Sequence, residues 1–227
     1  MSYLLKLYIS YNIGMNLYDN IKEIIYINLH DRPDRKQSIT DLLTTHFPDK
    51  KITRFDAYRP HHVPSDVRFI KNKLRDADHA LKMPGIVGCY CSHLCILKEL
   101  HTRYKNKSDT HDLVYIVEDD TKFDENFINF IKKPIKIKDW NIILGVNPES
   151  NFVRHGLNER GGLLRHIFGT NIVIYNLKKI DELYKKIISL PVIYDYDLMM
   201  FHNIRRMFFF DTNLIQLDED VKESDIR

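Results

Sequence analysis

Three adjacent carboxylates, Glu118, Asp119 and Asp120, are the side chains best suited to chemistry in this sequence. They directly follow residues 113–117, a short apolar run rich in β-branched and aromatic residues that is typical of a buried strand. Ligands of open α/β sheets bind where strands end. Adjacent carboxylates repel one another unless a cation lies among them, and a hard divalent cation that carries phosphate oxygens meets that need. Taken alone, the three acids fit a metal site and a solvated acidic turn equally well.

A second group with chemical potential surrounds Ser92 and His93, which suggest a nucleophile and its base. Ser92 is not flanked by the glycines of a nucleophile elbow and no acid partner is identifiable, so a hydrolase is the weaker hypothesis. The neighbouring Cys89, Cys91 and Cys95 suggest zinc together with His93. Because Cys89 and Cys91 would point about 200° apart on a helix, they cannot both face one ion, and we expect small core residues instead.

Two further strands and a helix are predicted to accompany the strand that carries the three acids. Residues 23–29 form a β-branched run that indicates a buried strand. Asp31 then caps a helix that has Pro33 in its first turn and apolar residues at helical spacing through residues 39–47. A strand around residues 52–58 completes a strand–helix–strand order, which favours a parallel pair.

The rest of the chain continues this alternation. A helix is predicted over residues 85–100, immediately before the acid-tipped strand. Strands are predicted over residues 140–145 and 169–175, and a helix with one apolar face over residues 177–190. An aromatic segment follows at residues 208–210. These elements predict an α/β fold.

Composition and charge narrow the class of protein. A chain of 227 residues fits one α/β domain with a sizeable core, so residues 1–227 are expected to form a single domain. The 34 basic and 31 acidic residues are interspersed, which argues against a nucleic-acid partner. Three closely spaced cysteines indicate a reducing compartment. Because no signal peptide or membrane span is recognisable, the expected location is the cytoplasm.

Five segments, in order along residues 23–226, resemble glycosyltransferase family 25, which includes lipopolysaccharide-biosynthesis glycosyltransferases and collagen galactosyltransferases. The matching segments are residues 25–29 with Arg32 and Arg35, residues 84–93, residues 117–120, Gly169-Thr170 with the following strand, and residues 191–197 with a closing motif at residues 224–226. One departure lies after the Ser-His pair, where the family often has tryptophan and this chain has residues 94–97, Leu-Cys-Ile-Leu.

The resemblance implies an α/β fold of GT-A type, which is a Rossmann-like mixed sheet flanked by helices. It implies a hexose transfer from a nucleoside-diphosphate sugar, with a UDP-sugar expected, and usually Mn²⁺ or another divalent cation. The acceptor would be a glycan, a lipo-oligosaccharide or a collagen-like chain. A composition rich in Ile, Lys, Asn and Tyr fits the AT-rich genomes of certain bacteria and large DNA viruses. The cytoplasm would then be that of a bacterium or of an infected host cell.

The resemblance also suggests roles for the acids. On an extended segment, Glu118 and Asp120 point to one side and Asp119 to the other. We therefore expect Asp120 to hold the metal, with Glu118 acting directly or through water, and Asp119 to meet the ribose or donor sugar. His202 can complete the coordination, although a surface or core histidine is the simpler interpretation.

The remaining expected site residues surround the donor and the acceptor. Arg32 and Arg35 follow the first strand within reach of a nucleotide, while Arg35 can alternatively pair with a carboxylate on its helix. The donor side further includes Asn28, Ser92, His93, Gly169 and Thr170. On the acceptor side, Asp195 or Asp197 is expected to accept the proton of the acceptor hydroxyl or to orient the donor sugar.

The alternative is a protein of another class, which keeps the fold for binding or assembly without turnover. The intact acidic cluster favours an enzyme.

Overall fold

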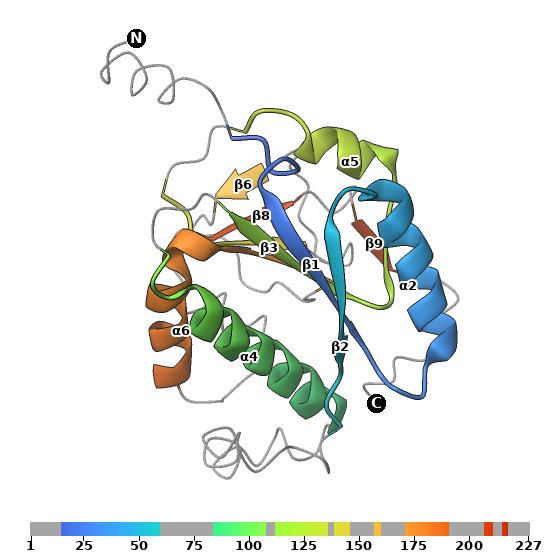
Figure 1. Ribbon diagram of the computed structural model, residues 1–227, viewed down its shortest axis with the longest axis horizontal. Helices are drawn as coiled ribbons and strands as arrows, with labels where there is room; N and C mark the ends of the chain where they lie inside the picture. The colour runs from blue at the N-terminus through green and yellow to red at the C-terminus, as the bar shows by residue number, and fades with distance from the viewer. Residues whose placement is uncertain are drawn as a thin grey trace.

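The computed structural model describes a mixed β-sheet covered by helices (Figure 1). The described residues are 15–59, 84–107, 112–135, 139–145, 157–159, 171–190, 207–210 and 215–217. The strands are β1 Ile21–Asn28, β2 Lys51–Asp56, β3 Leu113–Glu118, β4 Thr121–Phe123, β5 Ile142–Gly145, β6 Leu157–Glu159, β7 Ile172–Asn176, β8 Met207–Phe210 and β9 Ile215–Leu217. The helices are α2 Pro33–His46, α4 Pro84–Tyr104, α5 Glu125–Ile131 and α6 Ile180–Ser189, the last preceded by the 3₁₀ turn η4 Leu177–Lys179.

The main sheet has seven strands in the order β2-β1-β3-β7-β5-β8-β6, and β4 pairs with β9 in a separate two-stranded sheet. Strands β2, β1 and β3 run parallel, whereas β7 is antiparallel to both β3 and β5. The predicted mixed α/β sheet and the predicted parallel strand–helix–strand pair are confirmed. In the register of β1 with β3, Ile27 lies opposite Glu118, so the acids meet the carboxyl end of β1.

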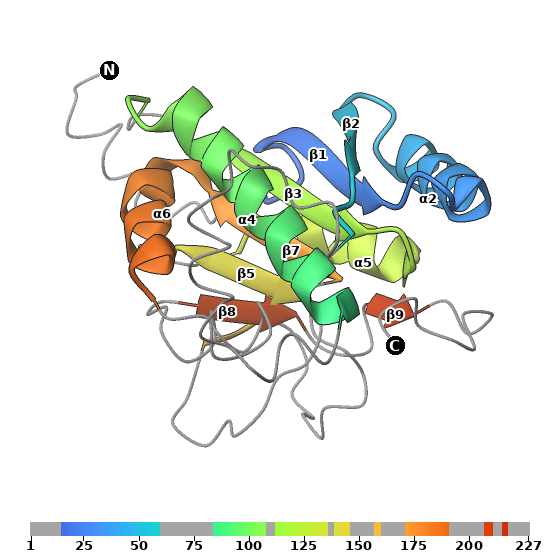
Figure 2. The ribbon, with the colours of Figure 1, turned by 90° about the horizontal axis from the view of Figure 1, so that it is seen from below.

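Both faces of the sheet are buried. Helices α4 and α6 run side by side over one face, and α2 and α5 cover the other (Figures 1 and 2). Val114 and Ile116 of β3 pack under α4 and α6, while Tyr115 and Val117 face the opposite core. This burial on both sides explains why β3 reads as a continuous apolar run without alternation.

One local prediction, the Asp31 helix cap, is wrong. Helix α2 begins at Pro33, so the cap position belongs to Arg32, which makes no side-chain cap hydrogen bond. Asp31 lies one residue too early for its carboxylate to cap the helix in the usual way, and it pairs with Arg59 instead. Pro33 in the first turn is confirmed.

Within the described part of the chain, every helix is too short or not apolar enough to cross a membrane.

Candidate functional site

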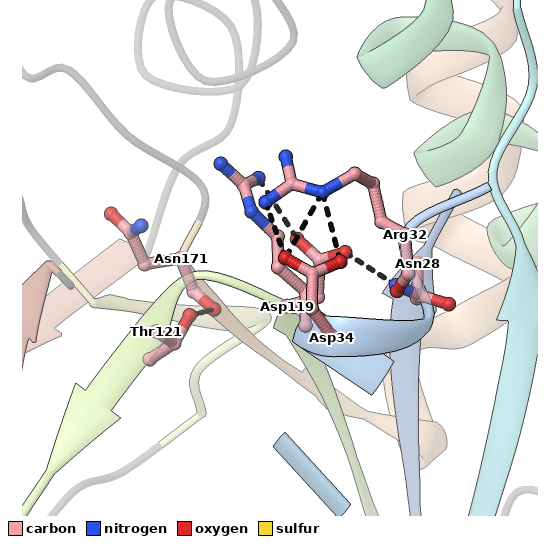
Figure 3. Close-up of polar contacts among 7 residues, drawn as sticks. Asn28, Arg32, Asp34, Asp119, Thr121 and Asn171 are labelled. Atoms are coloured by element: carbon pink, nitrogen blue, oxygen red, sulfur yellow. Dashed lines mark hydrogen bonds and ion pairs between the residues drawn. The ribbon is translucent and has the colours of Figure 1, made fainter. Parts of the chain in front are cut away.

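The three acids lie where β3 ends, next to the end of β1. Glu118 is the last residue of β3, and the chain then turns through Asp119 and Asp120 into β4. The carbonyl of Asn171, just before β7, accepts a hydrogen bond from the Glu118 backbone N–H at 3.0 Å. It also accepts one from Thr121 Oγ1 at 2.9 Å (Figure 3). These two bonds fix both ends of the acidic turn. Because Asp119 and Asp120 are in a turn, the expected strand alternation of the three side chains does not extend past Glu118.

Asp119 is held by the first strand and the helix that follows it. Its Oδ2 accepts a hydrogen bond from Asn28 Nδ2 at 2.7 Å, and Arg35 Nη1 lies 3.4 Å from its Oδ1. Burial raises the pKa of Asp119, and the nearby Glu118 adds to this rise, while Asn28 and Arg35 oppose it. The structure therefore brings together three predicted donor-side residues, Asn28, Arg35 and Asp119.

Asn28 is the link between these elements. It is 1 % exposed, and its amide also donates to the Arg32 carbonyl at 3.0 Å and accepts from Arg54 Nε at 3.0 Å. A buried amide with all of these partners is fixed in orientation. Asn28 thus ties the turn after β1 and strand β2 to Asp119.

The surroundings of Asp120 differ from those of Asp119. Its Oδ1 lies inside the protein without a hydrogen-bond partner among the described residues. Burial, followed by the charges of Glu118 and Asp119, raises the pKa of Asp120 to about 7, although Arg35 acts in the opposite direction. An acid that is desolvated and surrounded by other acids is stabilised in its charged form by a cation. The residues present therefore fit a divalent metal ion bound through Asp120.

Glu118 turns toward helix α4. Its Oε1 lies 3.1 Å from His93 Nε2 and accepts a hydrogen bond from Cys89 Sγ at 3.5 Å. His93 is fully buried, whereas the Glu118 side chain keeps 18 % of its surface exposed. The predicted metal-side acid and the predicted donor-side histidine are therefore direct neighbours.

The two predicted arginines differ in their surroundings. Arg32 makes hydrogen bonds from Nε and Nη2 to Asp34, an exposed carboxylate of the first helical turn (Figure 3). The Asp34 carboxylate of α2 is therefore paired with Arg32, which precedes the helix. Arg35 reaches across to Asp119, and both side chains of that pair are nearly buried.

Ser92 lies in the body of α4 and not at its start. Its hydroxyl donates to the Gly88 carbonyl at 2.8 Å and accepts from the Tyr58 backbone N–H at 2.9 Å. These contacts hold the segment after β2 against α4. Because Ser92 faces Tyr58 while His93 faces Glu118, the two residues have different partners, and the geometry gives no support to a hydrolase.

The cysteines separate into two groups. Cys91 is fully buried in the core, with Cys95 packed at its edge, so the predicted core role is confirmed for these two. Burial raises the pKa of Cys91 to about 12. Cys89 is half-buried and faces His93 and Glu118, so the core prediction is wrong for this residue. The reason is that position 89 shares a helix face with position 93, one turn later.

Several predicted site residues fall outside the described residues, and their positions are not part of the geometry above. These are Gly169, Thr170, Asp195, Asp197 and His202.

Two contributors to the site, Arg54 and Asn171, were missed in the sequence. Cys89 was expected in the core rather than beside His93 and a metal ion, although its spacing of four residues to His93 places both on one helix face. Arg54 and Asn171 gave no usable signal, because their contacts with Asn28 and with the acidic turn depend on which strands become neighbours in space.

The comparisons with known proteins agree with this arrangement. The family model described as glycosyltransferase family 25 (LPS biosynthesis protein) matches residues 21–160, which include β1, the acidic turn and most of the residues described above. The chain belongs to glycosyltransferase family 25, and it is a transferase of that class. No curated protein matches the sequence at a significant level.

Solved structures with a similar fold include further transferases. A glycosyltransferase involved in the glycosylation of the major capsid of PBCV-1 is 8 % identical, covers 90 % of this chain and 94 % of its own, and has a TM-score of 0.47. Mouse xyloside xylosyltransferase 1 in its apo form is 10 % identical over 86 % of this chain and 67 % of its own, with a TM-score of 0.36. The inositol-1-phosphate CTP transferase from T. maritima is 12 % identical over 90 % and 73 %, with a TM-score of 0.40. Likenesses this distant carry no argument about donor or acceptor.

Proposed function

We propose that this glycosyltransferase transfers a hexose from a nucleoside-diphosphate sugar, with UDP-sugar as the expected donor, to a glycan acceptor such as a lipo-oligosaccharide. The observation that carries the proposal is the buried Oδ1 of Asp120, which has no hydrogen-bond partner among the described residues and feels the charges of Glu118 and Asp119. A cation would stabilise such a carboxylate in its charged form. The phosphate oxygens of a nucleoside diphosphate bind the same kind of divalent cation. The family description, which refers to lipopolysaccharide biosynthesis, supports the choice of acceptor.

Asp120 and Glu118 are the residues proposed to hold the cation, with Mn²⁺ as the expected metal. When bound, a divalent cation stabilises the charge that develops on the diphosphate leaving group as the glycosidic bond breaks. Within the chain itself, burial leaves the ionised Asp120 carboxylate poorly solvated, so its charged form would be stabilised strongly by a nearby cation. His202 is proposed as a further ligand.

Asp119, Asn28 and Arg35 are proposed to position the donor. The contacts from Asn28 and Arg35 fix the Asp119 carboxylate, so it can accept hydrogen bonds from ribose or sugar hydroxyls without reorganising. The Arg35 guanidinium, at the same place, can also contact phosphate oxygens. Arg32, Ser92, His93, Gly169 and Thr170 complete the proposed donor side.

Acceptor activation is proposed for Asp195 or Asp197. A carboxylate at the reacting sugar can accept the proton of the acceptor hydroxyl or orient the donor sugar. Replacing each aspartate separately by asparagine assigns the role. Only the substitution of the acting residue should reduce the rate of transfer strongly while leaving donor binding intact.

The proposal is tested by the melting temperature with UDP, with and without Mn²⁺. A ligand that binds only the folded protein raises the melting temperature. We expect UDP to raise it in the presence of Mn²⁺ and not in its absence, and Asp120→Asn to remove the effect. Asp41→Asn, which changes an exposed carboxylate on α2, is the matched control and should keep it. An equal UDP effect in metal-free protein would contradict the role of the cation.

A further inference from the structure

We infer that Cys89, His93 and Glu118 form a second cation site, which takes a thiophilic divalent ion of the Zn²⁺ class. The site lies on the α4 side of the acidic turn and differs from the set proposed for the donor metal because it includes the sulfur of Cys89. All three ligand atoms, the Cys89 Sγ, a ring nitrogen of His93 and a carboxylate oxygen of Glu118, lie within 4.8 Å of one another.

The fold brings these ligands together from two elements. Cys89 and His93 are four residues apart on α4, so their side chains emerge from the same face one turn apart. Glu118 ends β3 beneath that face and directs its Oε1 between them. The rigid helix and the central strand hold the three groups in place before any ion arrives.

The observed separations suit tetrahedral coordination. Zinc binds sulfur, nitrogen and carboxylate oxygen at distances of about 2.0–2.3 Å, so neighbouring ligand atoms in a tetrahedron are about 3.3–3.7 Å apart. Here Glu118 Oε1 lies 3.1 Å from His93 Nε2 and 3.5 Å from Cys89 Sγ. Small shifts of the side chains are enough to admit an ion where hydrogen bonds now join these atoms. Binding would transfer the thiol proton to solvent and leave a neutral imidazole whose ring nitrogen faces the ion.

The ligand set also decides which ions would bind. A thiolate and an imidazole select zinc-like ions, whereas carboxylate oxygens alone suit Mn²⁺ and Mg²⁺. The site is open on one side, because Glu118 keeps 18 % of its side chain exposed and Cys89 is half-buried, while His93 is fully enclosed. Three protein ligands with one open position describe a site that can exchange its ion.

Glu118 is a proposed ligand in both cation sites, so an ion bound at one site should weaken binding at the other. An ion bound by Cys89 and His93 would draw Glu118 toward α4 and away from the donor metal. Zinc should therefore inhibit transfer in competition with Mn²⁺. This competition rests on the proposed function, whereas binding of the ion itself does not.

Titration of the metal-free, full-length chain with Co²⁺, without nucleotide, tests the site. Tetrahedral cobalt bound to a thiolate gives an intense near-ultraviolet charge-transfer band together with visible bands, and Zn²⁺ should abolish both by displacement. We expect Cys89→Ser to remove the near-ultraviolet band and Cys95→Ser, on the same helix, to keep it. Asp120→Asn should also keep the band, although it should lose the UDP effect on the melting temperature, so the two proposals fail separately.

A second variant protects the test against misfolding of Cys89→Ser. Glu118→Gln preserves the shape of a partly exposed side chain, and it should weaken Co²⁺ binding at least about tenfold, as expected when a metal site loses an essential partner. Circular dichroism establishes that each variant is folded. A near-ultraviolet band that persists in folded Cys89→Ser, unchanged affinity in Glu118→Gln, or no such band in the unmodified protein would each overturn the proposal.

Discussion

Asn28, the last residue of β1, donates a 2.7 Å hydrogen bond to the carboxylate of Asp119, which lies 91 residues later in the turn after β3. The two strands are parallel neighbours, so this bond joins their carboxyl ends. The orientation of Asp119 therefore depends on β1 and on the turn into α2.

Replacing Asn28 by aspartate should destabilise the protein while barely changing its shape. The variant loses the amide donor to Asp119 and to the Arg32 carbonyl, and places a second carboxylate against Asp119. At neutral pH we expect the free energy of unfolding to fall by about 1–3 kcal/mol. Urea denaturation measures the loss, and Asn129→Asp, on an exposed position of α5, is the control that should change little. Equal stability of the two variants would contradict the role assigned to Asn28.

The two arginines after β1 should differ in their effect on donor binding. Arg35 meets Asp119 in a nearly buried pair, whereas Arg32 is bound to the exposed Asp34. Arg35→Gln should therefore weaken UDP binding in the presence of Mn²⁺ by about tenfold or more, because a hydrogen bond to a charged group contributes about 1.5–3 kcal/mol. Arg32→Gln should weaken binding less. Isothermal titration calorimetry compares them, and the reverse order would exclude the proposed role of Arg35.

Asp120 should make the metal-free protein less stable as the pH rises. The folded protein binds the Asp120 proton more tightly than the unfolded chain does, because the pKa is about 7 in the fold and ordinarily 3.8. Between these values the folded state carries the extra proton, so the free energy of unfolding decreases with increasing pH. Asp120→Asn should remove this part of the slope and should be more stable than the original protein at pH 8.

Urea denaturation at a series of pH values from about 4.5 to 8 checks this expectation. Mn²⁺ should restore stability to the original protein at pH 8 and should have little effect on Asp120→Asn, since a cation compensates the charge only where the charge exists. Parallel pH profiles for the two metal-free proteins would show that Asp120 is not the group responsible.

The sequence was most informative where burial alone determines structure. Strands β1 and β3 were predictable because both faces are covered, which requires unbroken apolar runs. The position of Glu118, Asp119 and Asp120 at the end of a strand followed from the same pattern. The family resemblance then added a function to a cluster that by itself fitted a solvated turn equally well.

The partners of the acids could not be predicted in the same way. The pairing of Asp119 with Asn28 and Arg35 requires β1 and β3 to be neighbours, and the strand order in space does not follow from the local pattern. Glu118 faces Cys89 because α4 crosses that end of β3, which is also a long-range relationship. Sequence reasoning thus located the acids correctly but gave no means of assigning their individual contacts.

Glu23, a buried carboxylate on β1 remote from the acidic turn, should control stability at acidic pH. It is 2 % exposed and accepts hydrogen bonds from Lys51 and Thr53 of β2, both at 2.7 Å, and from Arg103 of α4 at 2.8 Å. Burial alone would raise the pKa of Glu23, but these three partners outweigh it and hold the pKa below the ordinary value of 4.5.

A carboxyl whose pKa is lowered by folding stabilises the fold above its ordinary pKa, and this contribution is lost as the pH falls through the folded value. Glu23→Gln should therefore be less stable than the original protein at pH 7 and should lose less stability on acidification below about pH 4.5, as urea denaturation would measure.

Arg103→Ala should lower the free energy of unfolding by about 2–4 kcal/mol at pH 7, because it leaves the buried charge of Glu23 with fewer partners. Lys185→Ala, which removes an exposed pair with Asp181, is the control and should cost less than about 1 kcal/mol. If Arg103→Ala were no more costly than Lys185→Ala, the ion pair with Glu23 would not support the junction between β1 and α4.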